Sequence, residues 1–448
     1  MKMNTDEELR RRLQSYSRDN KDYWSFRGNA VREHAHGYLQ YPAMMVPQMQ
    51  GELIGIIREF DYDIKSVYDP FMGSGTVMTE SMLQGLNFIG QDINPLAVLI
   101  CKAKMGPFFE EALHKKTENL LNIINEDESD HIDINFPNIF KWFRRDTAME
   151  LSRIRRAIKR ETSKWSRRFF WIALAETIRL SSNSRTSTFK LHIRPAGEIR
   201  NRNISPIKFF EKIVRENLEK FSEIKRLLDK EGFIKKSRFT GTIEIRLEDS
   251  KKSAKTNGNG RERFDLLVTS PPYGDNSSTV PYGQYSYLLL QWIDIFDIDD
   301  SMDESFLSTT HEIDSRSLGG SRKNALEESL ETRKISKTLS QTLESLKDKP
   351  RDRAVRVAAF CRDLYKCIDS ILNNLKPNAY MIWTIGNRRV GKRPVPLDDI
   401  LCEFLTAHGA KDIIKFHRNI PSKRMAVKNN IANTMRMETI LVLKKGNS

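Results

Sequence analysis

The chain has 448 residues, a length that suggests two domains or one large domain with insertions. Hydrophobic residues make up 39% and charged residues 30%, and no run approaches the roughly 18 apolar residues of a membrane span, which argues against an integral membrane protein. The net charge of +15 and the pI near 9.5 favour a polyanionic partner.

The first 35 residues are polar and charged, and we expect them to form a partly ordered arm. The extreme N-terminus lacks the apolar segment of a signal peptide, which predicts a cytoplasmic protein. After the arm, Tyr41-Pro-Ala-Met-Met-Val-Pro47 leads into a predicted amphipathic helix. We expect this helix to pack beside the first strand.

A glycine-rich loop follows the first predicted strand. The strand ends at Tyr68, and Asp69-Pro-Phe-Met-Gly-Ser-Gly-Thr76 leads from it into a helix. Gly73 and Gly75 carry no Cβ, so the backbone can turn sharply and approach a ligand at the carboxyl edge of a parallel sheet. Glycines also occur in tight turns that bind nothing, and the loop alone leaves both possibilities open.

A second strand is predicted at 87–92, and it ends in Asp92. A carboxylate there can accept hydrogen bonds from both hydroxyls of a ribose, as nucleoside-bearing cofactors require. Asp92 could instead cap the next helix, although Asn94 is better placed for that role. Met78 stands where GxGxxG would have its third glycine, which argues against a dinucleotide cofactor.

Helical patterns replace the alternation of strands and helices between about 107 and 240. From Lys141 to Arg202 there are 17 basic residues and five acidic ones. An apolar stripe at helical spacing in 151–158 is flanked by cations that we expect to contact nucleic acid: Arg153, Arg155, Arg156, Lys159 and Arg160. The polar segment 181–194 adds Arg185 and Lys190, which suit phosphate and base-edge contacts. In both places the alternative is a solvated surface.

The sheet pattern resumes at 241–249, and the apolar strand that follows runs into Ser270-Pro271-Pro272-Tyr273. The prolines would rigidify a turn that presents Tyr273 beyond the sheet edge. Residues 301–352 are charged and polar, and we expect either a mobile insertion over the site or a helical flap. The remaining predicted helices are 355–375 and 398–408, and the remaining strands are 376–385 and 437–443.

Together, the segments Asp69–Thr76 and Thr269–Tyr273 resemble the two defining motifs of the amino-group DNA methyltransferases that use S-adenosylmethionine. The resemblance covers 36–106 and 241–445. It implies an α/β, Rossmann-like fold with a mostly parallel seven-stranded sheet, interrupted by a helical basic insertion. Residues 107–240 then become the candidate target-recognition region, a role for which 275–350 competes.

The resemblance also implies roles for individual residues. The cofactor-binding residues would be Tyr41, Pro42, Asp69, Phe71, Gly73, Gly75, Thr76, Asp92 and Asp249. Asp92 would bind the ribose, and Asp249 would lie near the adenine. The catalytic residues would be Ser270, Pro271, Pro272 and Tyr273. The Ser270 hydroxyl and the Pro271 carbonyl are candidate acceptors for amino protons, and Tyr273 would stack on a base rotated out of the duplex.

Within that family, Ser-Pro-Pro-Tyr is usual for cytosine-N4 enzymes, so we expect methylation of cytosine N4 in double-stranded DNA, within a restriction-modification system and with a possible cognate restriction endonuclease. The alternatives are an adenine-N6 DNA methyltransferase, an RNA amino-group methyltransferase and a catalytically silent DNA-binding protein. None of the four cysteines follows a proline, which argues against cytosine-C5 chemistry. They also lack zinc-ligand spacing, so no metal is expected.

Overall fold

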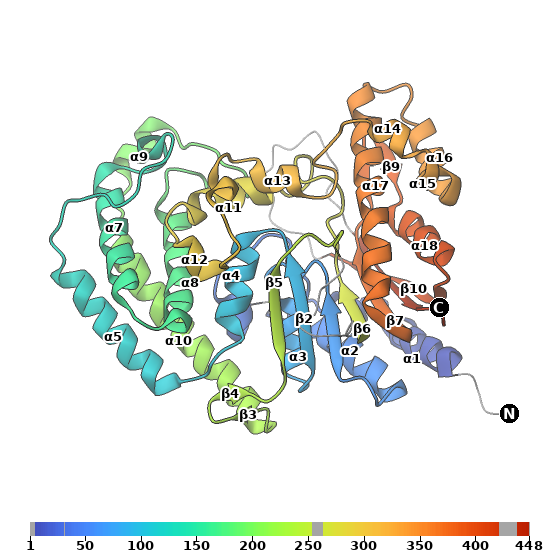
Figure 1. Ribbon diagram of the computed structural model, residues 1–448, viewed down its shortest axis with the longest axis horizontal. Helices are drawn as coiled ribbons and strands as arrows, with labels where there is room; N and C mark the ends of the chain where they lie inside the picture. The colour runs from blue at the N-terminus through green and yellow to red at the C-terminus, as the bar shows by residue number, and fades with distance from the viewer. Residues whose placement is uncertain (1–4, 31, 253–262, 421–436, 448) are drawn as a thin grey trace.

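The computed structural model describes residues 5–30, 32–252, 263–420 and 437–447, and its centre is a seven-stranded sheet (Figure 1). In spatial order the strands are β10 (Lys411–Asn419), β11 (Met437–Lys444), β7 (Leu375–Ile385), β6 (Phe264–Thr269), β1 (Ser66–Asp69), β2 (Asn87–Asp92) and β5 (Ile243–Leu247). Neighbours pair in parallel except at β11, which is antiparallel to both β7 and β10. This arrangement confirms the expected mostly parallel, Rossmann-like methyltransferase sheet.

Successive side chains of the strands enter two different cores, because neighbouring residues of a strand point to opposite faces. Val67 of β1 packs in the core on one face, and Tyr68 packs in the core on the other. The first face is covered by α2 (Pro47–Phe60), α3 (Thr76–Met82) and α4 (Pro95–Lys104). The second is covered by α17 (Arg351–Asn373) and α18 (Leu397–Ala407).

The helical insertion lies beside α4, at the left of Figure 1. Its elements are α5 (Glu110–Glu126), α6 (Ile139–Trp142), α7 (Arg145–Arg160), α8 (Lys164–Ser181), α9 (Ala196–Asn201), α10 (Pro206–Lys230), β3 (Ile234–Lys235) and β4 (Arg238–Phe239). Helix α8 packs against α4, α7 and α10, and its Phe170 and Trp171 are fully buried. Neither α10, with 25 residues, nor any other helix within the described ranges is long and apolar enough to cross a membrane.

The chain after β6 forms a series of short helices. They are α11 (Tyr282–Leu290), α12 (Ile295–Ile298), η3 (Glu304–Leu307), α13 (Glu312–Arg316), α14 (Ala325–Glu328), α15 (Leu330–Ile335) and α16 (Lys337–Glu344). Helices α14, α15 and α16 pack against α17, and α15 and α16 also contact α18. Leu339 and Leu343 bury one turn of α16. The segment 301–352 therefore forms short helices, and we refer to it as the flap; its role as an insertion over the site stays a prediction. A small hairpin, β8 (Arg388–Val390) and β9 (Arg393–Val395), follows β7.

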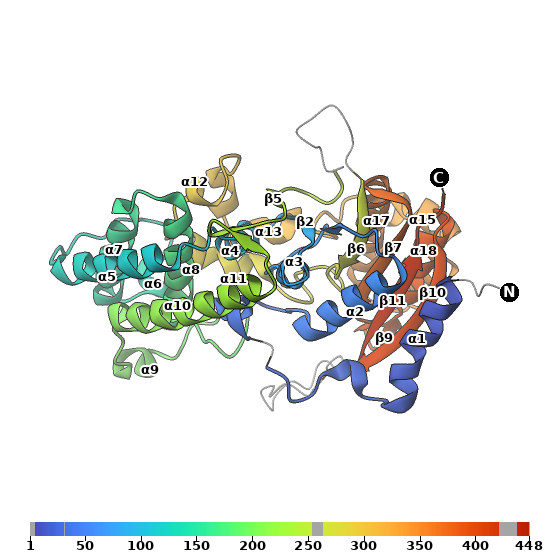
Figure 2. The same cartoon turned by 90° about the horizontal axis from the view of Figure 1, so that it is seen from below.

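The N-terminal segment is more ordered than the partly ordered arm that its polarity suggests. It contains α1 (Thr5–Asp19), η1 (Tyr23–Ser25) and η2 (His34–Gly37), and Figure 2 shows α1 beside β10. Leu9 and Leu13, one helical turn apart, are fully buried against the sheet layer. Asp6 accepts hydrogen bonds from side chains of three strands: Tyr380, Lys411 and Lys444. These contacts hold the segment on the sheet.

Candidate active site

The glycine-rich loop between β1 and α3 depends on its two glycines. Gly73 and Gly75 have φ angles of +49° and +74°, and a Cβ on Gly75 would lie 2.7 Å from Cys101 Sγ. The loop is also supported by Lys104, whose buried ammonium donates to the Ser74 carbonyl at 2.7 Å. Burial lowers the pKa of Lys104 to about 8. The loop thus has a fixed backbone, and at Gly73 and Gly75 no side chain stands between that backbone and a ligand.

Asp69, at the end of β1, connects this loop to the second motif. Its Oδ1 accepts from Thr269 Oγ1 at 2.6 Å and from the Phe71 amide at 3.0 Å. Its Oδ2 is buried and has no hydrogen-bond partner among the described residues. Burial raises the pKa of Asp69 to about 7. A buried acceptor without a donor is the kind of group that a bound ligand can satisfy.

Asp92, at the end of β2, holds two loops in place. Its two oxygens accept from the amides of Gly73 (2.9 Å) and Asn94 (2.8 Å). Burial raises the pKa of Asp92 to about 6. Asn94 caps α4 by accepting from the Leu96 amide at 3.1 Å, which confirms that the cap is Asn94. A carboxylate has about four lone-pair positions, so Asp92 keeps acceptor capacity for a ligand hydroxyl.

Tyr41 lies over the loop, next to the predicted cofactor residues. Its hydroxyl accepts from Asn94 Nδ2 at 2.9 Å, and a Cβ on Gly73 would lie 3.7 Å from its ring. The ring stacks on Tyr282, at 5.8 Å between centroids, and meets Tyr285 edge-on at 6.1 Å. The segment before α2 and the start of α11 therefore share one aromatic wall.

The other predicted cofactor residues are placed around the same loops. Pro42 and Thr76 are buried, whereas Phe71 is half-buried against the core on the α17 face. Asp249, beyond the end of β5, pairs with Lys251 at 3.2 Å. The adjacent Ser250 hydroxyl donates to the Pro70 carbonyl, which fixes this segment beside the glycine loop. Within the described ranges, no three His, Cys, Asp or Glu side chains are placed to hold a metal ion.

The Ser-Pro-Pro-Tyr loop begins where β6 ends. Ser270 Oγ lies 3.2 Å from Tyr273 Oη, and Tyr273 donates to Glu438 Oε1 at 3.0 Å. Glu438 Oε2 in turn accepts from Arg418 Nε at 2.7 Å. Burial and the neighbouring Glu438 raise the pKa of Tyr273 well above its usual value, so the phenol keeps its proton. A chain of hydrogen bonds thus runs from Ser270 through Tyr273 and Glu438 to Arg418.

Glu438 is a residue that the sequence interpretation missed. It is a single acid at the start of an apolar strand, and no motif marks it. Its position becomes clear only when β10 and β11 pair, because that register sets Arg418 opposite Glu438. A second missed pair, Asp275 and Arg388, lies 3.3 Å apart and fixes the backbone that follows Tyr273.

The cations of α7 that we expected to contact nucleic acid are mostly paired within the protein. Arg156 donates to Asp127 at 2.8 Å and to Asp133 at 2.6 Å. Three others have partners too: Arg153 with the carbonyls of Glu128 and Ser129, Arg155 with the Trp292 carbonyl, and Lys159 with Asp294 at 3.6 Å. Arg160 is the one of the five for which the described structure contains no side-chain partner. Four of these cations thus hold α7 to neighbouring segments of the protein.

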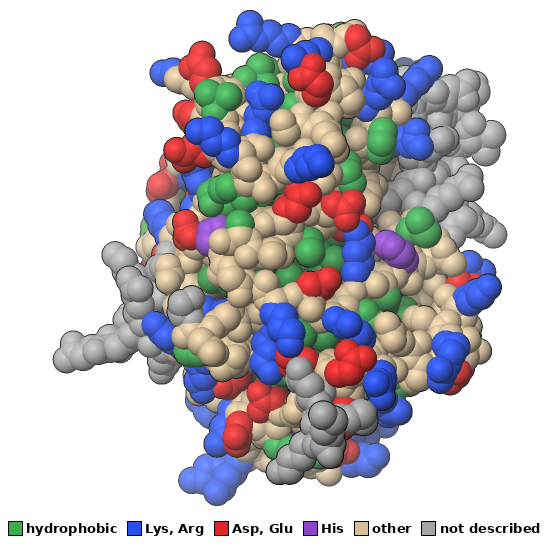
Figure 3. Space-filling view, turned by 90° about the vertical axis from the view of Figure 1, so that its right-hand side faces the viewer, with side chains coloured by type: hydrophobic (Ala, Val, Ile, Leu, Met, Phe, Trp, Pro, Cys, Tyr) green, Lys and Arg blue, Asp and Glu red, His purple; other side chains and the backbone are tan. Residues whose placement is uncertain are grey.

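Arg185 and Lys190 are placed differently. Both side chains are exposed and have no ion-pair partner in the described part of the chain. Their loop is closed by a backbone bridge between Ser184 and Ile193. It is held against α11 by a hydrogen bond from the Leu191 amide to Gln284 Oε1, at 3.2 Å. These two cations therefore lie near the aromatic wall of the candidate site. On the face of the molecule seen in Figure 3, by contrast, basic side chains are interspersed with acidic ones.

Comparison with known proteins extends the family resemblance to nearly the whole chain. No family model matches it. It is 33% identical over 457 residues to the type II methyltransferase M.MvaI of Kocuria varians, with 98% of this chain and 97% of that protein covered. The type II methyltransferase M.MjaII of Methanocaldococcus jannaschii is 36% identical over 95 residues, 21% of this chain and 17% of that protein. Among solved structures, the rRNA methyltransferase aviRa of Streptomyces viridochromogenes aligns over 92% of this chain and 96% of its own, at 10% identity and a TM-score of 0.31, too low to support an argument.

Proposed function

The chain belongs to the type II methyltransferase family, and on that basis we propose that it methylates the N4 amino group of cytosine at a specific site in duplex DNA. The similarity that shows the family spans almost all of both proteins, including both loops of the candidate site. The methyl donor is S-adenosylmethionine. Cytosine N4 is favoured by Ser270, because the family's cytosine-N4 enzymes usually carry Ser-Pro-Pro-Tyr.

The residues of the glycine loop fit this cofactor. The loop has two positions without a side chain, Gly73 and Gly75. Asp92 keeps acceptor capacity beside it, and Asp69 Oδ2 is a buried acceptor without a donor in the described structure. Tyr41 supplies an apolar wall above Gly73. We assign the ribose hydroxyls to Asp92 and the adenine end to Asp249. When bound, S-adenosylmethionine supplies a methyl group on a sulfonium, an electrophile that an amino lone pair can attack directly.

One hydrogen bond carries the proposal: Thr269 Oγ1 donates to Asp69 Oδ1 at 2.6 Å. Asp69 begins the cofactor loop, and Thr269 immediately precedes Ser270. The bond therefore fixes the distance between the loop for the methyl donor and the loop for the target base. Such positioning matters because transfer requires the donor and the acceptor atom to be aligned.

The direction in which Ser270 donates its hydroxyl proton follows from counting the protons of its neighbours. Tyr273 has one hydroxyl proton, which it donates to Glu438, so it can only accept from Ser270. Ser270 then directs its own proton at Tyr273 and has only lone pairs left for a substrate. An exocyclic amino group has protons to donate. Ser270 Oγ is therefore an acceptor for it, and Glu438 is the positioning residue that sets this direction of donation.

Accepting the amino protons prepares the nitrogen for transfer. The lone pair of a cytosine amino group is delocalised into the ring, so the group is a poor nucleophile. Hydrogen bonds to Ser270 Oγ and to the Pro271 carbonyl would favour a tetrahedral nitrogen with its lone pair directed at the methyl group. The target base must leave the duplex to reach these acceptors, and the Tyr273 ring is the proposed stacking surface. Pro271 and Pro272 keep this turn rigid.

For the DNA, the arrangement of cations favours the loop 183–194 over α7. Arg185 and Lys190 are exposed and have no ion-pair partner in the described chain, whereas most cations of α7 are engaged by other groups of the protein. The loop is also attached to α11, which shares the aromatic wall of the site. We therefore propose that Arg185 and Lys190 contact the duplex. A cognate restriction endonuclease stays a prediction.

The test is to hydrolyse DNA from a host that expresses the protein and to identify the methylated nucleoside by mass. We expect N4-methylcytosine, absent from a host that expresses Ser270→Ala. N6-methyladenine would replace the proposal with the adenine alternative. Methylation of RNA but not of duplex DNA would indicate an RNA enzyme, and failure to bind S-adenosylmethionine would indicate a silent DNA-binding protein. Mapping the modified positions across the genome would then give the target sequence.

A further inference from the structure

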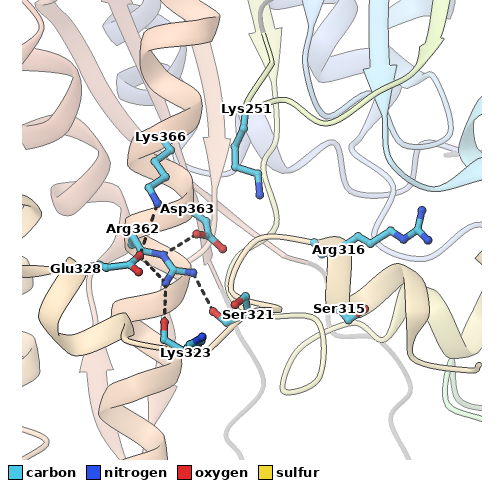
Figure 4. Close-up of a pocket in the computed structure, with 10 residues that line it drawn as sticks. Lys251, Ser315, Arg316, Ser321, Lys323, Glu328, Arg362, Asp363 and Lys366 are labelled. Carbon is cyan, nitrogen blue, oxygen red and sulfur yellow. Dashed lines mark hydrogen bonds and ion pairs between the residues drawn. The ribbon is translucent and has the colours of Figure 1, made fainter.

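A polar pocket lies between the flap and α17, with a volume of about 300 Å³ (Figure 4). Its lining comprises five cations, two acids and three serines: Lys251, Arg316, Lys323, Arg362, Lys366, Glu328, Asp363, Ser315, Ser317 and Ser321. Figure 4 shows Lys251 extending from the segment after β5 toward the cluster on α17. We call this cavity the flap pocket.

The two acids of the flap pocket are already engaged. Arg362, with only 6% of its side chain exposed, donates to Asp363 at 2.8 Å and to Glu328 at 3.0 Å. It also donates to the carbonyls of Ser321 and Lys323. Arg362 is thus a structural group that closes the flap turn, and its charge is balanced by the two carboxylates.

The positive charge that is left over comes chiefly from lysines. The Lys323 ammonium is exposed and has no partner within the described residues, and Lys366 lies 3.6 Å from a Glu328 that Arg362 already holds. Lys251 adds a third ammonium, paired with Asp249 at 3.2 Å. Lysines and serine hydroxyls around a polar cavity suit a phosphate, which binds point charges and hydrogen-bond donors.

The flap pocket is joined to the catalytic loop. Asn276, three residues after Tyr273, donates to Ser317 Oγ at 2.8 Å and to Asp314 at 3.1 Å. Ser317 lines the pocket. Arg322 of the flap also donates to Ser277 at 2.9 Å. An anion in the pocket would therefore lie next to the chain that presents the target-base residues.

We propose that the flap pocket binds a phosphate of the DNA backbone close to the target nucleotide, an inference that rests on the proposed function. The flap then has a defined use: it holds the loop after Tyr273 and positions the strand that carries the extruded base. The same chemistry would also admit a free phosphate-bearing ligand, and the experiment separates the two sources.

The test compares full-length wild type with the double variant Lys323→Gln/Lys366→Gln. Binding of a DNA duplex is measured by fluorescence anisotropy at several chloride concentrations. We expect the slope of log K against log[salt] to become shallower by roughly 0.9 for each phosphate that the variant no longer neutralises. The matched control is Lys65→Gln, an exposed lysine without an ion-pair partner in the described chain, at the amino end of β1. This control should keep the wild-type slope.

A second arm adds inorganic phosphate at constant ionic strength. One outcome would assign the pocket to a free ligand and overturn the proposal. In that outcome, phosphate weakens DNA binding by the wild type but not by the double variant, while the double variant keeps the salt slope of the wild type. A double variant with the slope of Lys65→Gln would also overturn it. Methylation of DNA by the wild type, measured in the same preparation, shows whether such a failure concerns the pocket alone or the proposed function.

Discussion

The carboxyl edge of the sheet and the helical insertion both concentrate polar residues, yet they use them differently. At the sheet edge, Asp69 bonds to Thr269 across two loops and keeps one oxygen without a donor in the described structure. In α7, Arg156 has all its charge satisfied by Asp127 and Asp133. The acids that neutralise α7 lie before and after the basic stretch from Lys141 to Arg202, so counting charge along the chain overstates what a partner can reach. A candidate site is therefore marked by polar groups that lack a partner within the protein, and a high count of charged residues does not mark one.

The largest effect on activity is expected from Glu438→Gln, at the carboxyl edge of the sheet. A glutamine amide can donate to Tyr273, which would then donate to Ser270 and turn the Ser270 proton toward the substrate. We expect kcat to fall roughly 10- to 100-fold, with the affinity for S-adenosylmethionine unchanged. This is less than the roughly 100- to 1,000-fold loss seen when a directly aligned donor is removed, because Glu438 acts through Tyr273.

The control for this prediction is Tyr273→Phe, which removes the hydroxyl that links Ser270 to Glu438. The double variant Tyr273→Phe/Glu438→Gln should be no slower than Tyr273→Phe alone, because Glu438 then has no hydroxyl to orient. Additive reductions of kcat would show that Glu438 acts by another route.

The counterpart in the insertion is Arg156→Gln. It leaves two partly buried carboxylates without their cation, and we expect the free energy of unfolding to fall by about 1–3 kcal/mol in urea titrations. DNA affinity should stay within about twofold of wild type, because this side chain is already engaged inside the protein. Arg160→Gln, on the same helix but without a partner in the described structure, should change neither quantity. Weakened DNA binding by folded Arg156→Gln would return α7 to the DNA interface.

A third prediction concerns the raised pKa of Asp69, about 7. Burial favours the protonated carboxyl, so the free energy of unfolding decreases as pH rises from about 4 to 7 and the carboxyl ionises. A bound cationic cofactor would offset that loss of stability. The affinity for S-adenosylmethionine should therefore fall as pH drops through about 7, by up to about tenfold per pH unit. Isothermal titration calorimetry above about pH 6 should show this pH dependence of the affinity in the wild type and not in Asp69→Asn. Parallel profiles for the two proteins would exclude Asp69 as the titrating group.

The smallest effect is expected for Arg185→Gln combined with Lys190→Gln. Both side chains are exposed and have no ion-pair partner in the described chain, so the free energy of unfolding should not change. Duplex affinity should fall several-fold near about 0.1 M salt, and the salt slope should become shallower by roughly 1–2 if each cation contacts a phosphate. Unchanged affinity with an unchanged slope would leave 183–194 as an ordinary surface loop.

Local patterns were enough to predict much of the sheet. The strand predicted at 87–92 coincides with β2, and the Asn94 cap is the one expected. The predicted helix 398–408 is α18 within one residue at each end. These elements are marked by residues close in sequence: an apolar run, an acid at its end and a cap. The family resemblance added the relation between the cofactor loop and the Ser-Pro-Pro-Tyr loop, which lie far apart in the chain.

What the sequence did not predict depends on distant partners. Strand β10 mixes Ile413, Ile414 and Phe416 with charged residues, and only its pairing with β11 makes it a strand. Glu438 gains its role from the same pairing. Helix α1 offers only Leu9 and Leu13 as buried apolar residues, too short a stripe to recognise in a polar segment. The roles of the individual site residues stay predictions for the experiments above.

Helix α1 has a further consequence for the solution behaviour of the protein. Strand β10 is the last strand at its end of the sheet, and such a strand exposes backbone groups that can pair with another chain. Helix α1 lies along it, and Arg10 Nε donates to the Ile413 carbonyl at 2.6 Å. The polar N-terminal segment thus shields a sheet edge against strand addition, and removing residues 1–19 should produce a chain prone to aggregate through β10.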